Sequence, residues 1–228
     1  MALEILGTSH IAEQSIKEIK NVVLTKRPDI IAVELDAQRV ASLLSGEKNK
    51  MSFSSAFTIG IKGYFFAKLV QFLQQKIGKT VGVIPGSEMK TAIELARKEK
   101  IQIALIDQPI AITLKNFSKA FTWREKFRFM GEILGGIVMP RRQIKRLGLD
   151  AIDLRKVPQE EVIEKMMNIM KERYPSVYKT IVEDRNKYMV RKLVKIMREF
   201  PEKNILAVVG AGHKKGMEEL LLKVDIVR

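Results

Sequence analysis

Two histidines occur in this chain of 228 residues, and both lie in the same local pattern. Gly7-Thr8-Ser9-His10 follows an apolar run at 2–6, and Gly210-Ala211-Gly212-His213 follows another at 205–209. A glycine directly after a strand lets the backbone turn tightly and approach a ligand. An imidazole can bind a metal or exchange a proton near neutral pH. We therefore interpret this matched pair of GxxH motifs as functional, although a lone histidine is more often a packing residue.

Two carboxylates also follow predicted strands. Glu34 closes the run at 30–33, and Asp107 follows the run at 101–106. The carboxyl ends of parallel strands share one edge of a sheet, where sites form. We therefore expect His10, Glu34, Asp107 and His213 to meet in one cleft. Glu34 in a salt bridge and Asp107 as a helix cap are the structural alternatives. Neither GxGxxG nor a phosphate-binding loop is present, so the carboxylates do not indicate a nucleotide site.

Arg185 lies on the apolar stripe of a predicted helix. The stripe follows steps of three and four residues and includes Val182, Met189, Leu193, Ile196 and Phe200. An arginine on an inward face must be paired or must face a cleft. Its guanidinium could hold a carboxylate such as Glu34 or Asp107, or stabilise a developing oxyanion.

The predicted elements place these residues in an α/β fold. Strands at 2–6, 30–33, 101–106 and 205–209 alternate with helices, which indicates a mostly parallel central sheet flanked by helices. Helices are predicted at 12–27, 36–45, 60–77, 87–99, 110–120, 122–138, 142–147, 159–173, 176–200 and 215–222, with Asp36 as an N-cap and weaker strands at 81–84 and 224–227. We expect a single domain over 1–228, with a large helical insertion or cap at 110–200 before the last GxxH strand.

Composition excludes several kinds of site. The chain has no cysteine, so disulfides, thiolate zinc sites, iron–sulfur clusters and a cysteine nucleophile are excluded. No run of 18 uncharged apolar residues could cross a bilayer, and the N-terminus lacks the pattern of a signal peptide. The sequence thus predicts a cytoplasmic protein or one peripheral to a membrane.

Basic charge is concentrated in two segments. The formal net charge is +15, and residues 46–79 and 115–146 contribute +5 and +7 of it, together with 11 of the 15 aromatic residues. Cations interleaved with large rings suit an anionic membrane surface. Single-stranded nucleic acid is the least favoured partner, because no nucleic-acid-binding signature is present. The structural alternative is that the rings belong to a helical core while the lysines are solvated.

The order of motifs resembles the TraB/PrgY family over roughly residues 5–216. The matching blocks are Gly7-Thr8-Ser9-His10, Arg27-Pro28-Asp29, Val33-Glu34-Leu35-Asp36, Arg39, Gly86-Ser87-Glu88-Met89, Ile106-Asp107, Glu183 to Met189, and Val209 to Gly216. This family is grouped with Tiki proteases, GumN proteins and erythromycin-esterase/ChaN-like hydrolases, which share two GxxH motifs, a glutamate and an arginine around an α/β site. Many members continue into C-terminal transmembrane helices, so the chain is expected to be either a soluble member or a form that ends before such a segment.

The resemblance implies a site and two kinds of function. The catalytic set is His10, Glu34, Arg185 and His213, and Gly7, Gly210, Gly212, Asp107 and Glu88 are expected to help bind substrate. Tiki members are described as metal-dependent proteases, so manganese, cobalt or zinc could be held by His10, Glu34 and His213. Members of TraB/PrgY type are linked to pheromone shutdown, which peptide cleavage or sequestration could serve.

Three hypotheses stay open at this point. One is a metal-assisted hydrolase of a peptide or ester, in which three protein ligands leave a position for an activated water. Another is the same hydrolase without metal, in which a histidine acts as general base beside Glu34. A third is a non-enzymatic regulator at the membrane surface that sequesters a peptide or docks a partner. A homo-oligomer is compatible with each.

Overall fold

The computed structural model describes residues 2–8, 12–45, 86–138 and 159–224. His10, the basic segment 46–79, and the elements predicted at 81–84 and 142–147 lie outside these ranges. The predicted strand at 224–227 lies outside them except for its first residue.

A parallel sheet, with four strands in the described ranges, forms the centre of the fold. The strands are β1 (Leu3–Thr8), β2 (Ile30–Val33), β3 (Gln102–Leu105) and β4 (Ile205–Gly210), in the order β1-β4-β2-β3. Thr8 pairs with Gly210, and Val33 pairs with both Val208 and Leu105, so the carboxyl ends of the strands form one edge. The predicted α/β fold with a parallel sheet is therefore confirmed.

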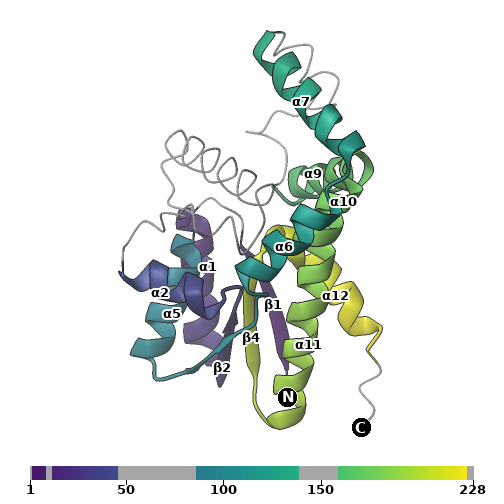
Figure 1. Cartoon of the computed structure of the whole chain (residues 1–228). Coiled ribbons are helices and arrows are strands. Elements are labelled where there is room, and N and C mark those ends of the chain that lie inside the picture. Colours follow the sequence, from purple (N-terminus) through teal and green to yellow (C-terminus); the bar gives the residue numbers. More distant parts are fainter. Residues whose placement is uncertain (1, 9–11, 46–85, 139–158, 225–228) are drawn as a thin grey trace.

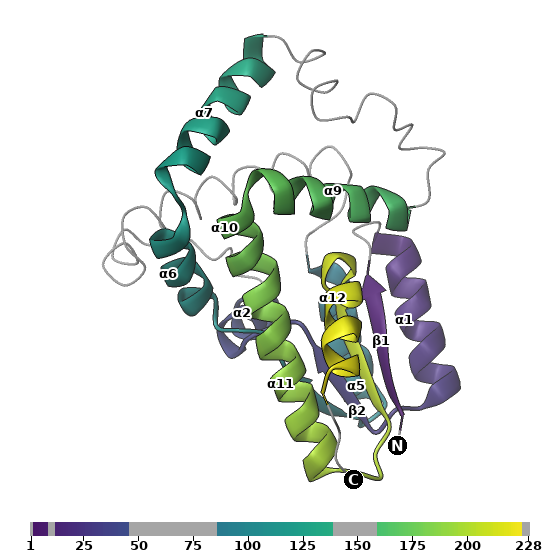
Figure 2. The same ribbon diagram turned by 90° about the vertical axis from the view of Figure 1, so that its right-hand side faces the viewer.

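Helices cover both faces of this sheet (Figures 1 and 2). On one face, α11 (Asp184–Glu199) and α12 (Ala211–Leu222) bury apolar side chains that include Met189, Leu193 and Met217. On the other, α1 (Ala12–Lys26) and α5 (Ser87–Lys98) pack through side chains that include Ile19, Val23, Ala92 and Ile93. The apolar residues of the strands therefore pack in two core clusters, one on each face, as a doubly covered parallel sheet requires.

Asp36 fixes the chain at the carboxyl edge. Its Oδ1 accepts a hydrogen bond of 2.7 Å from the Arg39 amide in the first turn of α2 (Ala37–Ser45), which confirms its predicted role as an N-cap. Its Oδ2 accepts a second bond of 2.8 Å from the Ile110 amide at the start of α6 (Ile110–Ala120). One buried carboxylate therefore ties together the segments that follow β2 and β3.

Most of the described residues between 110 and 200 are helical. They form α6, α7 (Trp123–Val138), α9 (Gln159–Arg173), α10 (Pro175–Tyr178), a π-helical turn at Lys179–Glu183, and α11. Figures 1 and 2 show α7 extending away from the sheet, whereas α11 lies directly on it. We predicted one helix at 176–200, but the π turn interrupts it. Such turns are frequent at functional sites.

The basic aromatic segment at 115–146 is helical as far as it is described. Phe117 is 1% exposed and packs inside the protein, as the structural alternative predicted, whereas Trp123 is 65% exposed and Phe127 is 72% exposed. Some rings of this segment are therefore in the core and others are at the surface, so neither of the two alternatives holds for every ring. Over the described ranges, no helix has both the length and the apolar character needed to cross a bilayer.

Candidate functional site

Arg185 is the centre of a buried polar cluster at the carboxyl edge of the sheet. A guanidinium has five N–H donors, and here each has an acceptor. The Nε atom donates to Asp107 Oδ1 at 3.0 Å, and Nη2 donates to Asp107 Oδ2 at 2.8 Å and to Glu34 Oε1. The Nη1 atom donates to the Ile181 carbonyl at 3.3 Å and lies 3.0 Å from His213 Nε2. Arg185 thus contacts three of the predicted site residues, Glu34, Asp107 and His213.

The sheet explains why these partners converge on one arginine. Glu34, His213 and Asp107 follow β2, β4 and β3, which are neighbours in the sheet. Arg185 reaches the same edge from the first turn of α11, which packs across the face of the sheet. The prediction that Arg185 points inward is therefore confirmed, and the expected pairing with carboxylates is present.

Three further groups hold the carboxylates in place. The Gly210 amide donates to Glu34 Oε2 at 2.7 Å, so the glycine that ends β4 binds the acid that follows β2. Asp107 also accepts 2.7 Å bonds from Arg39 Nη1 and from the Gln108 amide. Because these acceptors are buried, each bond avoids the cost of an unpaired charge.

His213 is fixed by an asparagine. Its Nδ1 lies 2.6 Å from Asn186 Oδ1, and an amide oxygen only accepts, so Nδ1 carries the proton and donates it. The other nitrogen, Nε2, then carries a lone pair that accepts from Arg185 Nη1. Burial lowers the pKa of His213 below its ordinary value; the charge of Glu34 opposes this shift, and that of Arg185 supports it. The imidazole is therefore neutral at pH 7 and is able to accept a proton.

Glu34 is ionised beside it. Burial alone would raise the pKa of Glu34, but attraction to His213 and Arg185 and the Gly210 hydrogen bond outweigh burial and lower the pKa to about 2. Because His213 is neutral at pH 7, Arg185 is the partner that keeps Glu34 charged there. Glu34 Oε1 also lies 3.3 Å from His213 Nε2, so this carboxylate could receive a hydrogen bond from a protonated imidazole.

Close contacts with neighbouring side chains explain why several positions around the site are glycines. A Cβ on Gly210 would lie 3.3 Å from Glu34 Oε2, and a Cβ on Gly7 would lie 3.1 Å from the Lys214 side chain. A Cβ on Gly216 would lie only 2.5 Å from Asn186 Nδ2, whereas one on Gly212 would meet the flexible end of Met167 at 2.9 Å. Gly210 and Gly216 thus leave room for the groups that hold Glu34 and His213.

These contacts predict opposite results for two glycine substitutions in the same helix. Replacing a helical glycine by alanine gains about 1 kcal/mol of helix propensity. We expect Gly212→Ala to be neutral or stabilising, because the Met167 methyl can turn away. We expect Gly216→Ala to lower the unfolding free energy by about 1–3 kcal/mol, because the buried Asn186 amide cannot move without releasing His213.

Chemical denaturation measures both variants, and the pKa of His213 from NMR provides a second readout. A shifted His213 pKa in Gly216→Ala alone is the expected result. If the two variants have the same stability and the same His213 pKa, the assigned role of Gly216 is wrong.

The remaining predicted residues are placed as follows. His10 lies outside the described residues, so its expected place beside His213 stays a prediction. Strand β1 ends at Thr8, two residues before His10, and Thr8 pairs with Gly210. Glu88 is buried in the first turn of α5, where it accepts a 3.4 Å bond from Ser87 Oγ, and it is not among the partners of Arg185.

Asn186 and Arg39 were missed as site residues. Two signals could have indicated these residues. Arg39 belongs to the motif blocks that resemble the family, and Asn186 directly follows Arg185 in the sequence. Their partners lie 68 residues away for Arg39 and 27 residues away for Asn186, so spacing alone did not reveal the contacts.

The described side chains do not form a complete metal site in this arrangement, and because His10 lies outside the described residues, metal binding by His10, Glu34 and His213 stays a prediction. Glu34 Oε1 and His213 Nε2 are the expected ligand atoms, and both already accept from Arg185. A metal ion between them would face the fixed charge of the guanidinium. Over the described ranges, no group of three or more histidine, aspartate or glutamate side chains has the geometry of a metal site.

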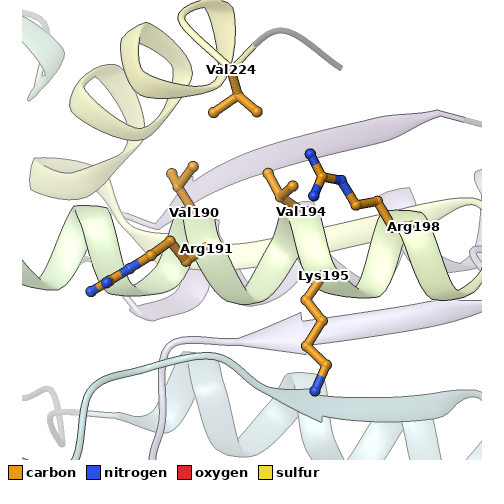
Figure 3. Close-up of a pocket in the computed structure, with 6 residues that line it drawn as sticks. All are labelled: Val190, Arg191, Val194, Lys195, Arg198 and Val224. Atoms are coloured by element: carbon orange, nitrogen blue, oxygen red, sulfur yellow. The ribbon is translucent and has the colours of Figure 1, made fainter. Parts of the chain in front are cut away.

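A cavity of about 330 Å³ lies elsewhere on α11, away from Arg185. Figure 3 shows Val190 and Val194 directed toward Val224, with Lys195 directed away from them. Arg191 and Arg198 complete the lining. None of these residues takes part in the contacts of Arg185, so the cavity is separate from the polar cluster.

Comparison with known proteins agrees with the motif order. The sequence model of the TraB/PrgY/gumN family matches residues 2–224. An uncharacterised protein of Methanocaldococcus jannaschii is 34% identical over 223 residues, which cover 97% of this chain and 53% of that protein. The TraB domain-containing protein of Homo sapiens is 25% identical over 239 residues, covering 94% of this chain and 61% of that protein, and the Bos taurus protein is 24% identical over the same shares. The chain spans between half and two thirds of the length of these relatives. Because the family match covers nearly the whole chain, the chain belongs to the TraB/PrgY/gumN family.

Proposed function

We propose that this protein is a hydrolase of peptide or ester bonds, with His213 as the general base. The observation that carries the proposal is the state of His213: a neutral imidazole whose Nδ1–H is fixed by Asn186, and whose Nε2 lies between Arg185 and Glu34. A neutral imidazole has a lone pair that can take a proton from water, and a carboxylate beside it stabilises the imidazolium that forms. The cluster is shielded but not sealed, because the side chains of Arg185 and His213 remain 13% and 10% exposed.

The proton transfer would change the hydrogen bonds of His213 and Arg185 so that an N–H of Arg185 becomes free to bind the substrate oxyanion. The Nε2 lone pair must first be released by Arg185 Nη1. It can then take a proton from the attacking water, and the new N–H can bond to Glu34 Oε1, 3.3 Å away. The protonated Nε2 can no longer accept from Arg185 Nη1, so that N–H of Arg185 loses its partner. This donor becomes available as negative charge develops on the carbonyl oxygen of the substrate. Base and oxyanion donor would thus be coupled through one nitrogen, and the charged donor stabilises the transition state.

The three contacts of Arg185 with carboxylates would stay in place during this step. Both Asp107 oxygens and Glu34 Oε1 hold the guanidinium, so a single N–H can be exchanged without moving its charge. A preorganised donor of this kind needs little reorganisation when charge develops. Asn186 would act as a positioning residue that keeps the reactive lone pair on Nε2.

Digestion of a peptide library and a panel of carboxylic esters, followed by mass spectrometry, tests the proposal. We expect wild-type protein to cleave members of one panel, and His213→Ala to lower the rate at least about 100-fold, as loss of a general base does. Lys215→Ala is the control, because Lys215 is 71% exposed two residues along the same helix. Circular dichroism of each variant checks the fold.

Two other outcomes would contradict the metal-free reaction. Turnover that a chelator abolishes and that manganese, cobalt or zinc restores would support the metal-assisted version expected from the family resemblance. Peptide binding without turnover in any panel, retained in His213→Ala, would support the non-enzymatic regulator.

A further inference from the structure

Helix α7 is held to the protein by its polar side. Glu125 Oε1 accepts a 2.8 Å bond from the Ser176 amide, and its Oε2 accepts the Ser176 hydroxyl. One turn further, Phe129 meets Tyr174 edge to face with ring centroids 6.1 Å apart. Glu132 then accepts from Arg173 Nε at 3.0 Å and from the Tyr174 hydroxyl at 2.5 Å. The spacing of 125, 129 and 132 places these contacts on one helical face.

The opposite face of α7 is apolar and exposed. Trp123, Phe127 and Met130 follow the same spacing of four and three residues, half a turn away, and are 65%, 72% and 57% exposed. The rings of Trp123 and Phe127 lie 6.0 Å apart, so they form a continuous surface. A helix of a soluble domain ordinarily turns its apolar face inward. Large exposed apolar rows mark interaction sites.

The charges on α7 follow the same division. Both acids of α7, Glu125 and Glu132, are on the inner face, each bonded to partners from the segment at 173–176. Arg124 and Lys126 flank the apolar row, and Lys126 Nζ lies 4.4 Å from the Trp123 ring centroid. The outer face of α7 therefore offers cations and apolar side chains, with its acids turned away.

We propose that the outer face of α7 binds the surface of an anionic lipid bilayer. Cations beside the row would meet headgroup phosphates, while the aromatic and methionine side chains enter the interface. Charge complementarity favours this occupant over a second copy of the chain, because the same basic face on both copies would repel. The proposal is independent of the proposed hydrolase and does not involve the polar cluster.

The chain contains its own reporter for this contact. Trp123 is its single tryptophan, so the intrinsic tryptophan fluorescence reports on α7 alone. Flotation and emission spectra would be recorded with vesicles of phosphatidylglycerol mixed with phosphatidylcholine, and with phosphatidylcholine alone, at low and at physiological salt. We expect flotation and a blue shift with the anionic vesicles, both weakened by salt.

Two pairs of variants localise the contact. Phe127→Ser/Met130→Ser and Arg124→Glu/Lys126→Glu should each lower the vesicle partition coefficient at least about tenfold. Leu24→Ser on α1 and Arg191→Glu/Lys195→Glu on α11 are matched controls, because they change an exposed apolar residue and exposed cations elsewhere. We expect the apolar control to leave binding unchanged and the charge control to weaken it less than the α7 pair.

Several results would overturn the proposal. These are equal binding to neutral vesicles, no binding to anionic vesicles at low salt, or controls that weaken binding as much as the α7 variants. A blue-shifted tryptophan without lipid that depends on protein concentration would instead show that a second copy covers this face.

Discussion

Replacing Arg185 by methionine is expected to lower the free energy of unfolding by about 3–5 kcal/mol. Arg185 holds Glu34 and Asp107, whose side chains are only 10% and 2% exposed. Removing the guanidinium leaves two buried carboxylates next to each other without their counter-charge. The cost is the penalty of unpaired buried charge, which exceeds the value of the pair itself.

Arg191→Met provides the matched control, because Arg191 is exposed on the same helix and, among the described residues, donates to the Lys187 carbonyl of its own helix. Its stability should lie within about 0.5 kcal/mol of wild type, as for most surface changes. Urea denaturation at pH 7 compares the two variants. Equal midpoints for Arg185→Met and Arg191→Met would contradict the assigned role of Arg185.

A third variant separates charge from packing. Adding Asp107→Asn to Arg185→Met removes one of the unpaired charges, so we expect part of the lost stability to return. Arg185→Lys should not restore the wild-type value, since an ammonium has three donors and cannot reproduce the fork that holds Asp107. No recovery in the double variant would indicate that lost packing explains the effect.

Much of this polar cluster could be predicted from the residues that follow the strands. Glu34, Asp107 and His213 were predicted to meet because each follows a strand of a parallel sheet, and all three contact Arg185. The four strands were recognisable because buried parallel strands are short β-branched or apolar runs. Arg185 was recognisable because a charge on an apolar stripe needs a partner.

The partner of the histidine could not be predicted in this way. Asn186 lies next to Arg185 in the chain, but its contact with His213 depends on the phase of α11, which begins directly after the π turn at 179–183. A π turn adds a residue to the helical repeat, and the sequence carries no clear sign of it. The role of Gly216 could not be predicted from the sequence either, because it is visible only once the position of Asn186 is known.

The sequence predicted a basic aromatic surface in this segment, but it did not show which side of α7 would face the protein. An amphipathic pattern shows that a helix has two faces, and the usual inference is that the apolar face turns inward. Here Glu125 and Glu132 find partners 51 and 41 residues away, so the polar face turns inward instead. Those distant contacts are a tertiary effect that overrides the local pattern.

The second large expected effect is a loss of folding stability at acidic pH. The folded pKa of Glu34 is about 2 and its ordinary value is 4.5, so the group contributes roughly 3 kcal/mol of stability above pH 4.5. Because the folded pKa is the lower one, this contribution is lost as pH falls from 4.5 toward 2. The pKa of His213 is also lowered from 6.5, so the folded state binds fewer protons there too. Stability should therefore start to fall below pH 6.5 and fall further below pH 4.5.

Unfolding free energies of wild type, Glu34→Gln and His213→Gln across pH 7 to 3 test these two steps. We expect Glu34→Gln to be less stable than wild type at pH 7 and the difference to shrink as pH falls below 4.5, because the lost contribution then disappears from wild type as well. His213→Gln should lack the decline that begins near pH 6.5. Glu94→Gln is the control, since Glu94 is an exposed residue of α5 whose side chain is 59% accessible. A Glu34→Gln profile that runs parallel to wild type, as the control profile should, would show that Glu34 is not the group whose ionisation stabilises the fold.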